Sequence, residues 1–165
     1  MSLHIREYSA ADMAACLEVF DTNVPKYFSL EEREEFETFL KLPSCVYLVL
    51  VSDGKIVGCG GYYLNQERQE AGLCWGLVRR ELHGTGLGKR LLLERLARVA
   101  CHPEAAFIRL DTSQHTFGFF ERLGFITEHI TPNGYWEGLD RYDMRLELTL
   151  ERRHTIESVY REVLT

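Results

Sequence analysis

Three glycines at alternate positions, Gly84, Gly86 and Gly88, stand between an apolar segment that ends at Val78 and an amphipathic helical segment. Glycine removes the side chains that would keep a ligand away from the backbone, and a helix begins with N–H groups that have no partner within the helix. Backbone N–H groups in this arrangement bind anions. The residues around the three glycines, 77–92, therefore predict an anion-binding loop, with a pyrophosphate as the expected ligand.

Two better-known glycine motifs do not fit this loop. A P-loop requires a glycine, four further residues and then Gly-Lys-Ser/Thr, whereas here His83 stands at the first position and Arg90 at the last. The dinucleotide-binding fingerprint requires its third glycine three residues after the second, but these glycines are evenly spaced. The sequence predicts neither motif.

The loop resembles the acetyl-CoA loop of the GCN5-related N-acetyltransferase (GNAT) family. In that family an Arg or Gln, two residues, a Gly, one residue and a Gly or Ala follow a strand that ends in an apolar residue. Here His83, Gly86 and Gly88 occupy these places, and Val78 ends the strand.

A second stretch, Phe-Phe-Glu-Arg-Leu-Gly-Phe at residues 119–125, resembles the closing motif of the same family. The resemblance covers residues 3–148. The chain departs from the family pattern twice, because His83 replaces Arg or Gln, and Phe120 stands where many members have a Tyr.

Composition limits the classes of partner. A chain of 165 residues with 45% hydrophobic residues is expected to form one domain with a sizeable core. Its formal charge is 19 minus 25, or -6, and no block of Lys and Arg stands out, so nucleic acid is not an expected partner. An acidic surface is compatible with a cationic or amine substrate.

No run of about 18 apolar residues predicts a membrane helix, and the chain starts directly with an alternating strand rather than a signal peptide. We therefore expect a cytoplasmic protein without a membrane partner. The cysteines are odd in number, lack a Cys-x-x-Cys spacing and lie in apolar segments, which favours buried free thiols over a metal site or disulfides. They are Cys16, Cys45, Cys59, Cys74 and Cys101.

Periodicity, caps and turn residues predict an alternation of strands and helices. Asp53-Gly54 predicts a hairpin, and Pro132-Asn133-Gly134 lies in an expected long loop over 131–141. The expected strands are 3–8, 45–51, 55–64, 70–78, 106–112, 125–130 and 142–148, and the expected helices are 13–20 after a Ser9 cap, 30–40 after a Ser29 cap, 86–101, 116–123 and 150–164.

Some positions within these elements carry further expectations. Glycine in a strand interior, as at 58, 60 and 61, often marks a bulge or a close approach of another part of the chain. Arg90, Glu94 and Arg98 are expected to pair on the outer face of their helix. The last helix packs either on its own domain or across a homodimer interface, and the sequence leaves both open.

The resemblance implies a single-domain mixed α/β (α+β) fold with a mostly antiparallel central sheet flanked by helices. Residues 1–149 would form the acetyltransferase domain, and residues 150–165 a helical extension of it. In the family, the strand before the glycine loop and the strand after its helix splay apart, and the pantetheine arm of acetyl-CoA lies between them.

Backbone N–H groups of residues 83–89 would then bind the pyrophosphate, with side-chain contacts from Thr85 and Lys89. A main-chain N–H near Leu77 or Val78 would stabilise the oxyanion, a role worth about 3 kcal/mol when the donor is preorganised. The expected cofactor-binding residues are Leu77, Val78, His83, Gly84, Thr85, Gly86, Leu87, Gly88, Lys89, Thr112, Ser113 and Phe120.

A phenylalanine at position 120 cannot protonate the leaving thiolate. Water could do so, no acid could be needed because a thiol has a pKa near about 8.5, or His115 or Tyr142 could replace the missing tyrosine. Glu70 is the candidate general base on the strand before the loop. Two of these candidates also have an ordinary structural interpretation. His115 could cap a helix or line the pocket, and Glu70 could be a solvated charge at the end of a strand.

The first two helices and the loop between them commonly wall the acceptor site in the family, so Tyr27 and Phe28, beside Lys26, are candidates for substrate contact. They could instead anchor the loop by packing. Trp75 is expected to line the cleft or the core.

The sequence thus predicts an N-acetyltransferase that transfers an acetyl group from acetyl-CoA, used as a co-substrate without a metal, to a primary amine of a small molecule or a peptide. A non-catalytic acyl-CoA-binding or sensing module is the alternative, because of Phe120. A third hypothesis, an unrelated nucleotide-binding protein, is disfavoured by the spacing of the glycines.

Overall fold

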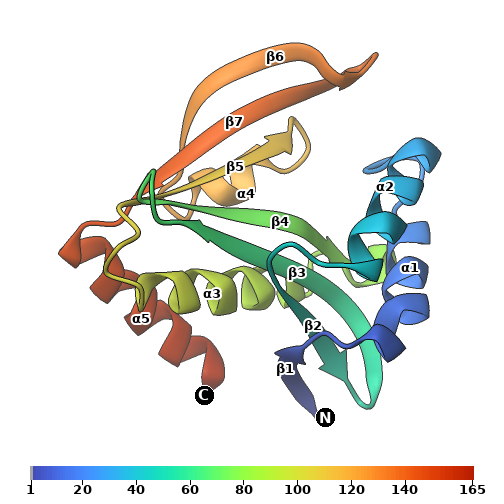
Figure 1. Ribbon diagram of the computed structural model, residues 1–165, viewed down its shortest axis with the longest axis horizontal. Coiled ribbons are helices and arrows are strands. Elements are labelled where there is room, and N and C mark those ends of the chain that lie inside the picture. Colours follow the sequence, from blue (N-terminus) through green and yellow to red (C-terminus); the bar gives the residue numbers. More distant parts are fainter. Residues whose placement is uncertain (1) are drawn as a thin grey trace.

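The structure, a computed structural model, describes residues 2–165; residue 1, where the predicted domain begins, lies outside the described residues. Figure 1 shows a twisted sheet with helices on both faces. The strands are β1 (Leu3–Glu7), β2 (Val46–Ser52), β3 (Lys55–Asn65), β4 (Glu70–Val78), β5 (Phe107–Ser113), β6 (Ile126–Trp136) and β7 (Leu139–Glu147). The helices are α1 (Met13–Asp21), α2 (Leu30–Lys41), α3 (Leu87–Ala100), α4 (Phe117–Glu121) and α5 (Leu150–Leu164), with 3-10 turns at Ala10–Asp12 and Arg80–Leu82.

The seven strands form one sheet in the order β1-β2-β3-β4-β5-β7-β6. Neighbouring strands are antiparallel except β4 and β5, which are parallel and are joined through α3. A parallel pair needs a crossover connection, and here a helix supplies it. The predicted mixed, mostly antiparallel sheet flanked by helices is confirmed.

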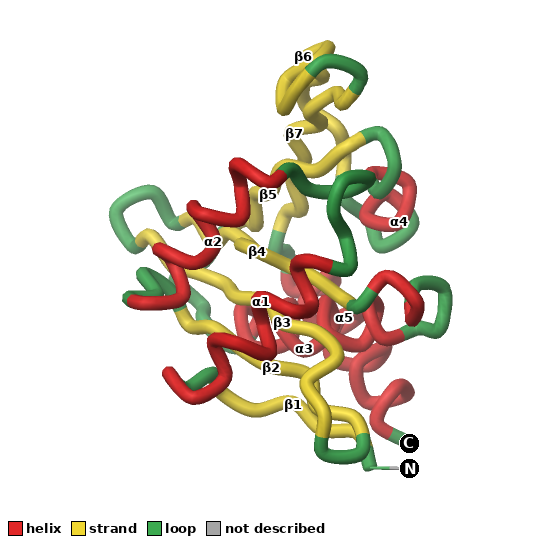
Figure 2. The backbone as a smooth tube through the Cα atoms, turned by 90° about the vertical axis from the view of Figure 1, so that its right-hand side faces the viewer, coloured by secondary structure: helices red, strands yellow, loops and turns green. Residues whose placement is uncertain are grey.

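Each face of the sheet carries its own apolar core. One core joins α1 and α2 to β2, β3 and β4, with Phe20, Phe36 and Val49 fully buried. The other joins α3, α4 and α5 to β4, β5 and β7, with Leu96, Ile108 and Met144 at its centre. Figure 2 shows α1 and α2 on the near side of the strands and α3 and α5 behind them.

Local signals in the sequence account for most element boundaries. The Ser29 side chain accepts a hydrogen bond from the Glu32 N–H, and the Glu32 carboxylate accepts one from the Ser29 N–H, which forms a capping box for α2. Asp53 and Gly54 have φ of 48° and 79°, the conformation that a two-residue hairpin requires. The predicted β2–β3 hairpin is therefore confirmed.

The unusual glycines of β3 make room for side chains from elsewhere. A Cβ atom on Gly60 would lie 3.1 Å from Cζ of Arg95 on α3, and one on Gly61 would lie 2.8 Å from Sγ of Cys45. A Cβ atom on Gly76 of β4 would meet the same guanidinium, 2.9 Å from its Nη2. The close approach predicted for these glycines is thus made by Arg95 at Gly60, by Cys45 at Gly61, and at Gly58 by the Leu77 carbonyl, 2.9 Å from an added Cβ atom.

The prediction of a long loop over residues 131–141 is wrong. β6 continues to Trp136 and β7 begins at Leu139, so a hairpin extends away from the body of the protein (Figure 1). Asn133, with φ of 53°, forms a bulge in which its side-chain oxygen accepts the Gly138 N–H at 2.7 Å. β6 is an edge strand, which tolerates Pro132 because no neighbour needs its missing N–H.

The expected outer-face placement of Glu94 is also wrong. Glu94 is buried, pairs with Arg98 at 2.9 Å and accepts a hydrogen bond from Tyr160 on α5. α5 therefore packs on α3 of the same chain, and Ile156 lies in the core.

Within residues 2–165, none of the helices is both long enough and apolar enough to cross a lipid bilayer.

Candidate active site

The glycine loop leads from the end of β4 into α3. Gly84 and Gly86 have left-handed backbone conformations, with φ of 79° and 90°, and Gly86 is the N-cap of α3. A Cβ atom at either glycine would meet no heavy atom within 4 Å, so open space borders the loop backbone. The N–H groups of the first helical turn, Leu87 to Lys89, have no acceptor within the helix. The loop thus has the form of an anion site before a helix N-terminus.

β4 and β5 are paired over only a short stretch. Glu70 to Gly72 pair with Phe107 to Arg109, and the pairing ends there, although both strands continue. β4 runs on to Val78 and the glycine loop, while β5 runs on to Ser113. The splay that the resemblance implied is present, and the glycine loop lies at its open end.

Strand alternation determines which main-chain groups of β4 face the splay. The Arg79 N–H donates to the Val57 carbonyl of the neighbouring strand at 2.9 Å, and Leu77 pairs with Cys59. Successive residues of a strand point their N–H and C=O groups to opposite edges. The N–H of Leu77 therefore faces β3, and that of Val78 faces the open edge, which favours Val78 over Leu77 as a donor to a ligand.

A β-bulge interrupts β4 in its open half. Cys74 pairs with Gly61 and Leu77 with Cys59, so two residues of β4, Trp75 and Gly76, lie opposite one residue of β3. Trp75 has a φ of 44°, and Gly76 is exposed. A bulge redirects side chains and twists the strand. Here it lies in the part of β4 that is no longer paired with β5.

Three predicted site residues from separate segments meet beside the open end. The rings of Tyr27 and His83 are 5.1 Å apart, and those of Tyr27 and His115 are 6.0 Å apart, both edge to face. The ammonium group of Lys26 lies 5.2 Å from the centre of the Tyr27 ring. His83 Nε2 lies 2.9 Å from the Val78 carbonyl, to which it must donate, because a carbonyl only accepts. Its ring is thus turned toward the strand end.

The residues after β5 border the opposite side of the splay. The Ser113 hydroxyl accepts the His115 N–H at 3.2 Å, and the hydroxyls of Thr112 and Thr116 are hydrogen-bonded to each other. These contacts hold the turn that carries His115.

Phe120 and Tyr142 lie on the core side of this turn. Phe120 packs edge to face on Phe125 at 5.7 Å, and Tyr142 stacks on Phe117 at 4.3 Å. Both side chains are half-buried against the core that includes α4.

Glu70 is separated from this group. It stands at the beginning of β4, where β4 and β5 are still paired, and it is 8% exposed. Its carboxylate accepts a hydrogen bond from Tyr63 at 3.3 Å. Eight residues of extended strand place it about 26 Å from Val78, so it does not join the histidines.

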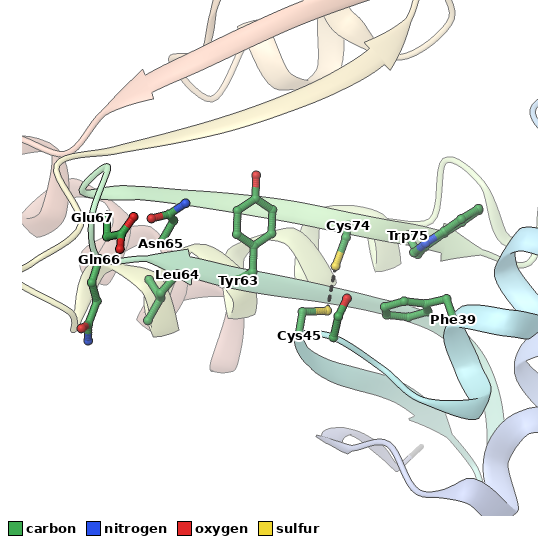
Figure 3. Close-up of a pocket in the computed structure, with 10 residues that line it drawn as sticks. Phe39, Cys45, Tyr63, Leu64, Asn65, Gln66, Glu67, Cys74 and Trp75 are labelled. Carbon is green, nitrogen blue, oxygen red and sulfur yellow. Dashed lines mark hydrogen bonds between the residues drawn. The ribbon is translucent and has the colours of Figure 1, made fainter.

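The α1–α2 side of the sheet forms an aromatic wall. Trp75 packs against Phe36 at 5.0 Å and against Phe28 at 6.4 Å, and Phe28 packs on Phe20 at 5.0 Å. Beside this wall lies a cavity of about 670 Å³ (Figure 3). Its lining residues are Phe39, Ser44, Cys45, Tyr63, Leu64, Asn65, Gln66, Glu67, Cys74 and Trp75.

Two residues that hold the open half of β4 were not predicted from the sequence. The Asn23 amide, 2% exposed, donates to the Val78 carbonyl at 3.0 Å, and the Tyr47 hydroxyl donates to the Trp75 carbonyl at 2.8 Å. Asn23 lies just after α1 and immediately before Val24-Pro25, and Tyr47 lies within β2. Nothing in the local sequence of either residue indicates its distant acceptor.

Comparison with known proteins gives a family match. Residues 15–125 match the Acetyltransferase (GNAT) family. None of the curated proteins matches the chain.

Solved structures share the fold at low sequence identity. A GNAT-family protein from Desulfovibrio desulfuricans has a TM-score of 0.77 and 22% identity, over 90% of this chain and 100% of that one. The ribosomal-protein-S18-alanine N-acetyltransferase from Escherichia coli has a TM-score of 0.75 and 19% identity, over 90% and 95%. An aminoglycoside 6'-N-acetyltransferase complexed with coenzyme A has a TM-score of 0.70 and 16% identity, over 88% and 97%.

Proposed function

The chain belongs to the GNAT family of acetyltransferases, and from this premise we propose that it transfers the acetyl group of acetyl-CoA directly to a primary amine of a small molecule or a peptide. One observation carries the proposal. The pairing of β4 with β5 ends at Gly72 and Arg109, and the glycine loop and the N-terminus of α3 stand at the open end of the resulting splay.

Holding acetyl-CoA is the first requirement of the reaction. The pyrophosphate would bind to the N–H groups of residues 83–89, with the exposed side chains of Thr85 and Lys89 beside it. The pantetheine arm would lie along the open edges of β4, at Leu77 and Val78, and of β5, at Thr112 and Ser113. Strand edges in this state offer main-chain donors and acceptors to an extended ligand.

Stabilising the oxyanion is the second requirement. The Val78 N–H faces the open edge, and the Val78 carbonyl is already held by Asn23 and His83. The pairing of Leu77 with Cys59 holds the peptide group that carries this N–H, and the bonds from Asn23 and His83 hold the next peptide group. The donor is therefore oriented before substrate arrives, which makes such a donor effective. We assign the oxyanion contact to this N–H.

Protonating the leaving thiolate is the third requirement. His115 is exposed beside the open end and is held through Ser113 and Tyr27. It is the preferred proton donor, and Tyr142 is the second candidate. Phe120, which cannot donate, packs on the core. Glu70 is not retained as a base, because it lies at the closed end of β4.

Binding the acceptor is the fourth requirement. Phe28 from the α1–α2 loop stacks on Trp75 of the β4 bulge, and Tyr27 from the same loop packs against His83, so aromatic side chains border the acceptor side. The structural neighbours include an enzyme that acts on an alanine of a ribosomal protein and one that acts on an aminoglycoside. Both classes of amine therefore belong in the test.

A thiol-release assay with acetyl-CoA over a panel of small amines and peptide N-termini tests the proposal. We expect amine-dependent release of CoA, and stabilisation of about 2.7 kcal/mol when acetyl-CoA is present at 100 times its Kd. Absence of any stabilisation at millimolar acetyl-CoA would contradict donor binding. Stabilisation without thiol release for every amine would instead support an acyl-CoA-binding module.

A further inference from the structure

The five cysteines occupy three kinds of environment. Cys16 and Cys59 are fully buried, and Cys101 is exposed. Cys45 and Cys74 are half-buried, and their Sγ atoms lie 2.9 Å apart (Figure 3). We call Cys45 and Cys74 the thiol pair.

The fold makes specific room for the thiol pair. Cys45 lies in the connection between α2 and β2, and Cys74 lies on β4, with β3 between these two strands. The residue of β3 opposite Cys74 is Gly61. A Cβ atom there would lie 2.8 Å from Sγ of Cys45 and 2.7 Å from the Val46 carbonyl. The contact between the thiols therefore depends on a glycine in the intervening strand.

The thiol pair is reachable by small solutes. Both cysteines line the cavity of about 670 Å³, in which Figure 3 shows their side chains pointing toward each other between Tyr63 and Trp75. The fully buried Cys16 and Cys59 do not line this cavity. A small reagent can therefore reach the thiol pair but not Cys16 or Cys59.

A buried positive charge lies on the opposite face of β3 from the thiol pair, since a Cβ atom on Gly60 would meet Arg95 and one on the next residue, Gly61, would meet Cys45. Arg95 is 5% exposed, and its nearest hydrogen-bond acceptors are carbonyl groups, Leu91 at 3.3 Å and Gly61 at 3.4 Å. No carboxylate of residues 2–165 lies within ion-pair distance of it. A cation beside a thiol favours the thiolate, which is the nucleophilic form.

The two thiols are not equivalent. The hydrogen bond from Cys74 lowers the pKa of Cys45, against the opposing effect of burial, and the charge of Arg95 lowers it further. The same hydrogen bond, followed by burial, raises the pKa of Cys74. Cys45 is thus the more acidic thiol of the pair and the one that more readily becomes the nucleophilic thiolate.

We propose that the thiol pair is a site of reversible oxidation, at which Cys45 and Cys74 form an intramolecular disulfide by exchange with a low-molecular-weight disulfide. The Cys45 thiolate attacks one sulfur of the reagent, its S–S bond breaks, and one thiolate leaves. Cys74 then loses its proton and attacks Cys45 in the mixed disulfide, and the second thiolate leaves. The protein loses two electrons and two protons, and the reagent is reduced to two thiols.

The disulfide would join the α2–β2 connection to β4 immediately before the bulge at Trp75. This chemistry does not depend on the proposed function, because it uses no residue of the glycine loop and no bound cofactor.

Glutathione disulfide, added to the folded full-length protein, tests the proposal. After alkylation of the remaining thiols, peptide mapping should show a Cys45–Cys74 cross-link that lacks the mass of two hydrogen atoms and is lost on reduction. Cys16 and Cys59 should remain thiols, and Cys101 should carry only a mixed disulfide. The proposal is overturned if Cys101 reacts while the thiol pair remains reduced, or if Cys45 stops at the mixed disulfide.

Four variants sharpen the test. Cys74→Ser should leave Cys45 as a persistent mixed disulfide, because the resolving thiol is gone. Cys101→Ser, the matched control, should not change the yield of the cross-link. Arg95→Met should slow the reaction of Cys45 about threefold to tenfold, the change that half to one pKa unit produces, and Arg95→Lys should keep the faster rate. Equal rates for Arg95→Met and the unaltered protein would overturn the role assigned to Arg95.

Discussion

The first three residues of β4 are paired with strands on both sides, whereas the rest of the strand, from Leu73 to Val78, is paired only with β3. We call these the closed half and the open half of β4. In the closed half, Glu70, Ala71 and Gly72 are all buried. In the open half, Trp75 and Gly76 form a bulge, Gly76 is exposed, and the strand ends at the glycine loop.

The difference shows how one strand can serve both stability and ligand binding. In the closed half, the main-chain N–H and C=O groups on both edges already make hydrogen bonds within the sheet, so none is free to bind a ligand. This half of the strand therefore serves only to hold the sheet together. The open half keeps one edge free, and residues from other elements, Asn23, Tyr47 and His83, orient its carbonyl groups. A carboxylate on the closed half, such as Glu70, is therefore badly placed for chemistry.

The largest effect is expected at the mouth of the open half. His115→Gln should reduce kcat about 100-fold with little change in KM for acetyl-CoA, because a positioned proton donor contributes at least that factor. Steady-state kinetics with the best amine of the panel measures it. His102→Gln is the matched control, since His102 pairs with Glu104 in a connection after α3. A loss below threefold would show that the thiolate leaves without this acid, and Tyr142→Phe then tests the second candidate.

A substitution in the closed half should affect stability alone. A Cβ atom on Gly72 would lie 2.2 Å from the Tyr63 ring, so Gly72→Ala must displace that ring. We expect the free energy of unfolding to fall by about 2 kcal/mol, a usual cost of overpacking, with unchanged affinity for acetyl-CoA. Urea denaturation and a binding titration measure the two quantities.

Tyr63→Ala provides the control for this prediction. In its background, Gly72→Ala should cost much less, because the clash is gone. An equal cost in both backgrounds would mean that the ring does not limit this position.

A substitution in the glycine loop should weaken acetyl-CoA binding, whereas an equivalent substitution elsewhere should not. Gly86→Ala forces a residue with a side chain into a φ of 90°, beside open space. We expect the Kd for acetyl-CoA to rise about tenfold, or about 1.4 kcal/mol. Isothermal titration calorimetry measures it.

Gly138→Ala is the matched control for the loop, because Gly138 has a φ of 85° and also has no heavy atom within 4 Å of an added Cβ. Both variants should lose similar stability, about 1 kcal/mol or somewhat more, and only Gly86→Ala should bind more weakly. Equal affinities in the two variants would contradict the assignment of the loop to the cofactor.

The smallest effect is expected at Arg95, on α3 behind the bulge. There a substitution should leave stability unchanged or increase it, whereas the other substitutions weaken stability, binding or catalysis. Arg95→Met removes a buried cation that lacks a carboxylate partner, so the free energy of unfolding should stay equal or rise by about 1 kcal/mol. Arg98→Met, on the same helix, removes the partner of the buried Glu94 and should destabilise the protein. Thermal denaturation of both variants tests the contrast, and a marked loss of stability in Arg95→Met would contradict it.

The sequence by itself determined the features that depend on neighbours along the chain. The capping box at Ser29, the hairpin at Asp53-Gly54 and the strand–glycine loop–helix unit around Gly86 are local, because each depends on backbone preferences and hydrogen bonds within a few residues. The two family motifs extended this local reading to the mixed sheet, which the structure and the family match confirm.

The tertiary structure decided everything that depends on which distant segments meet. It selected Val78 over Leu77 by the pairing with β3, brought Tyr27 and His115 to the glycine loop, and left Glu70 at the closed half of β4. It also extended β6 through Pro132, because that strand lies at the sheet edge. Such contacts arise from strand order and packing, which no short window of sequence contains.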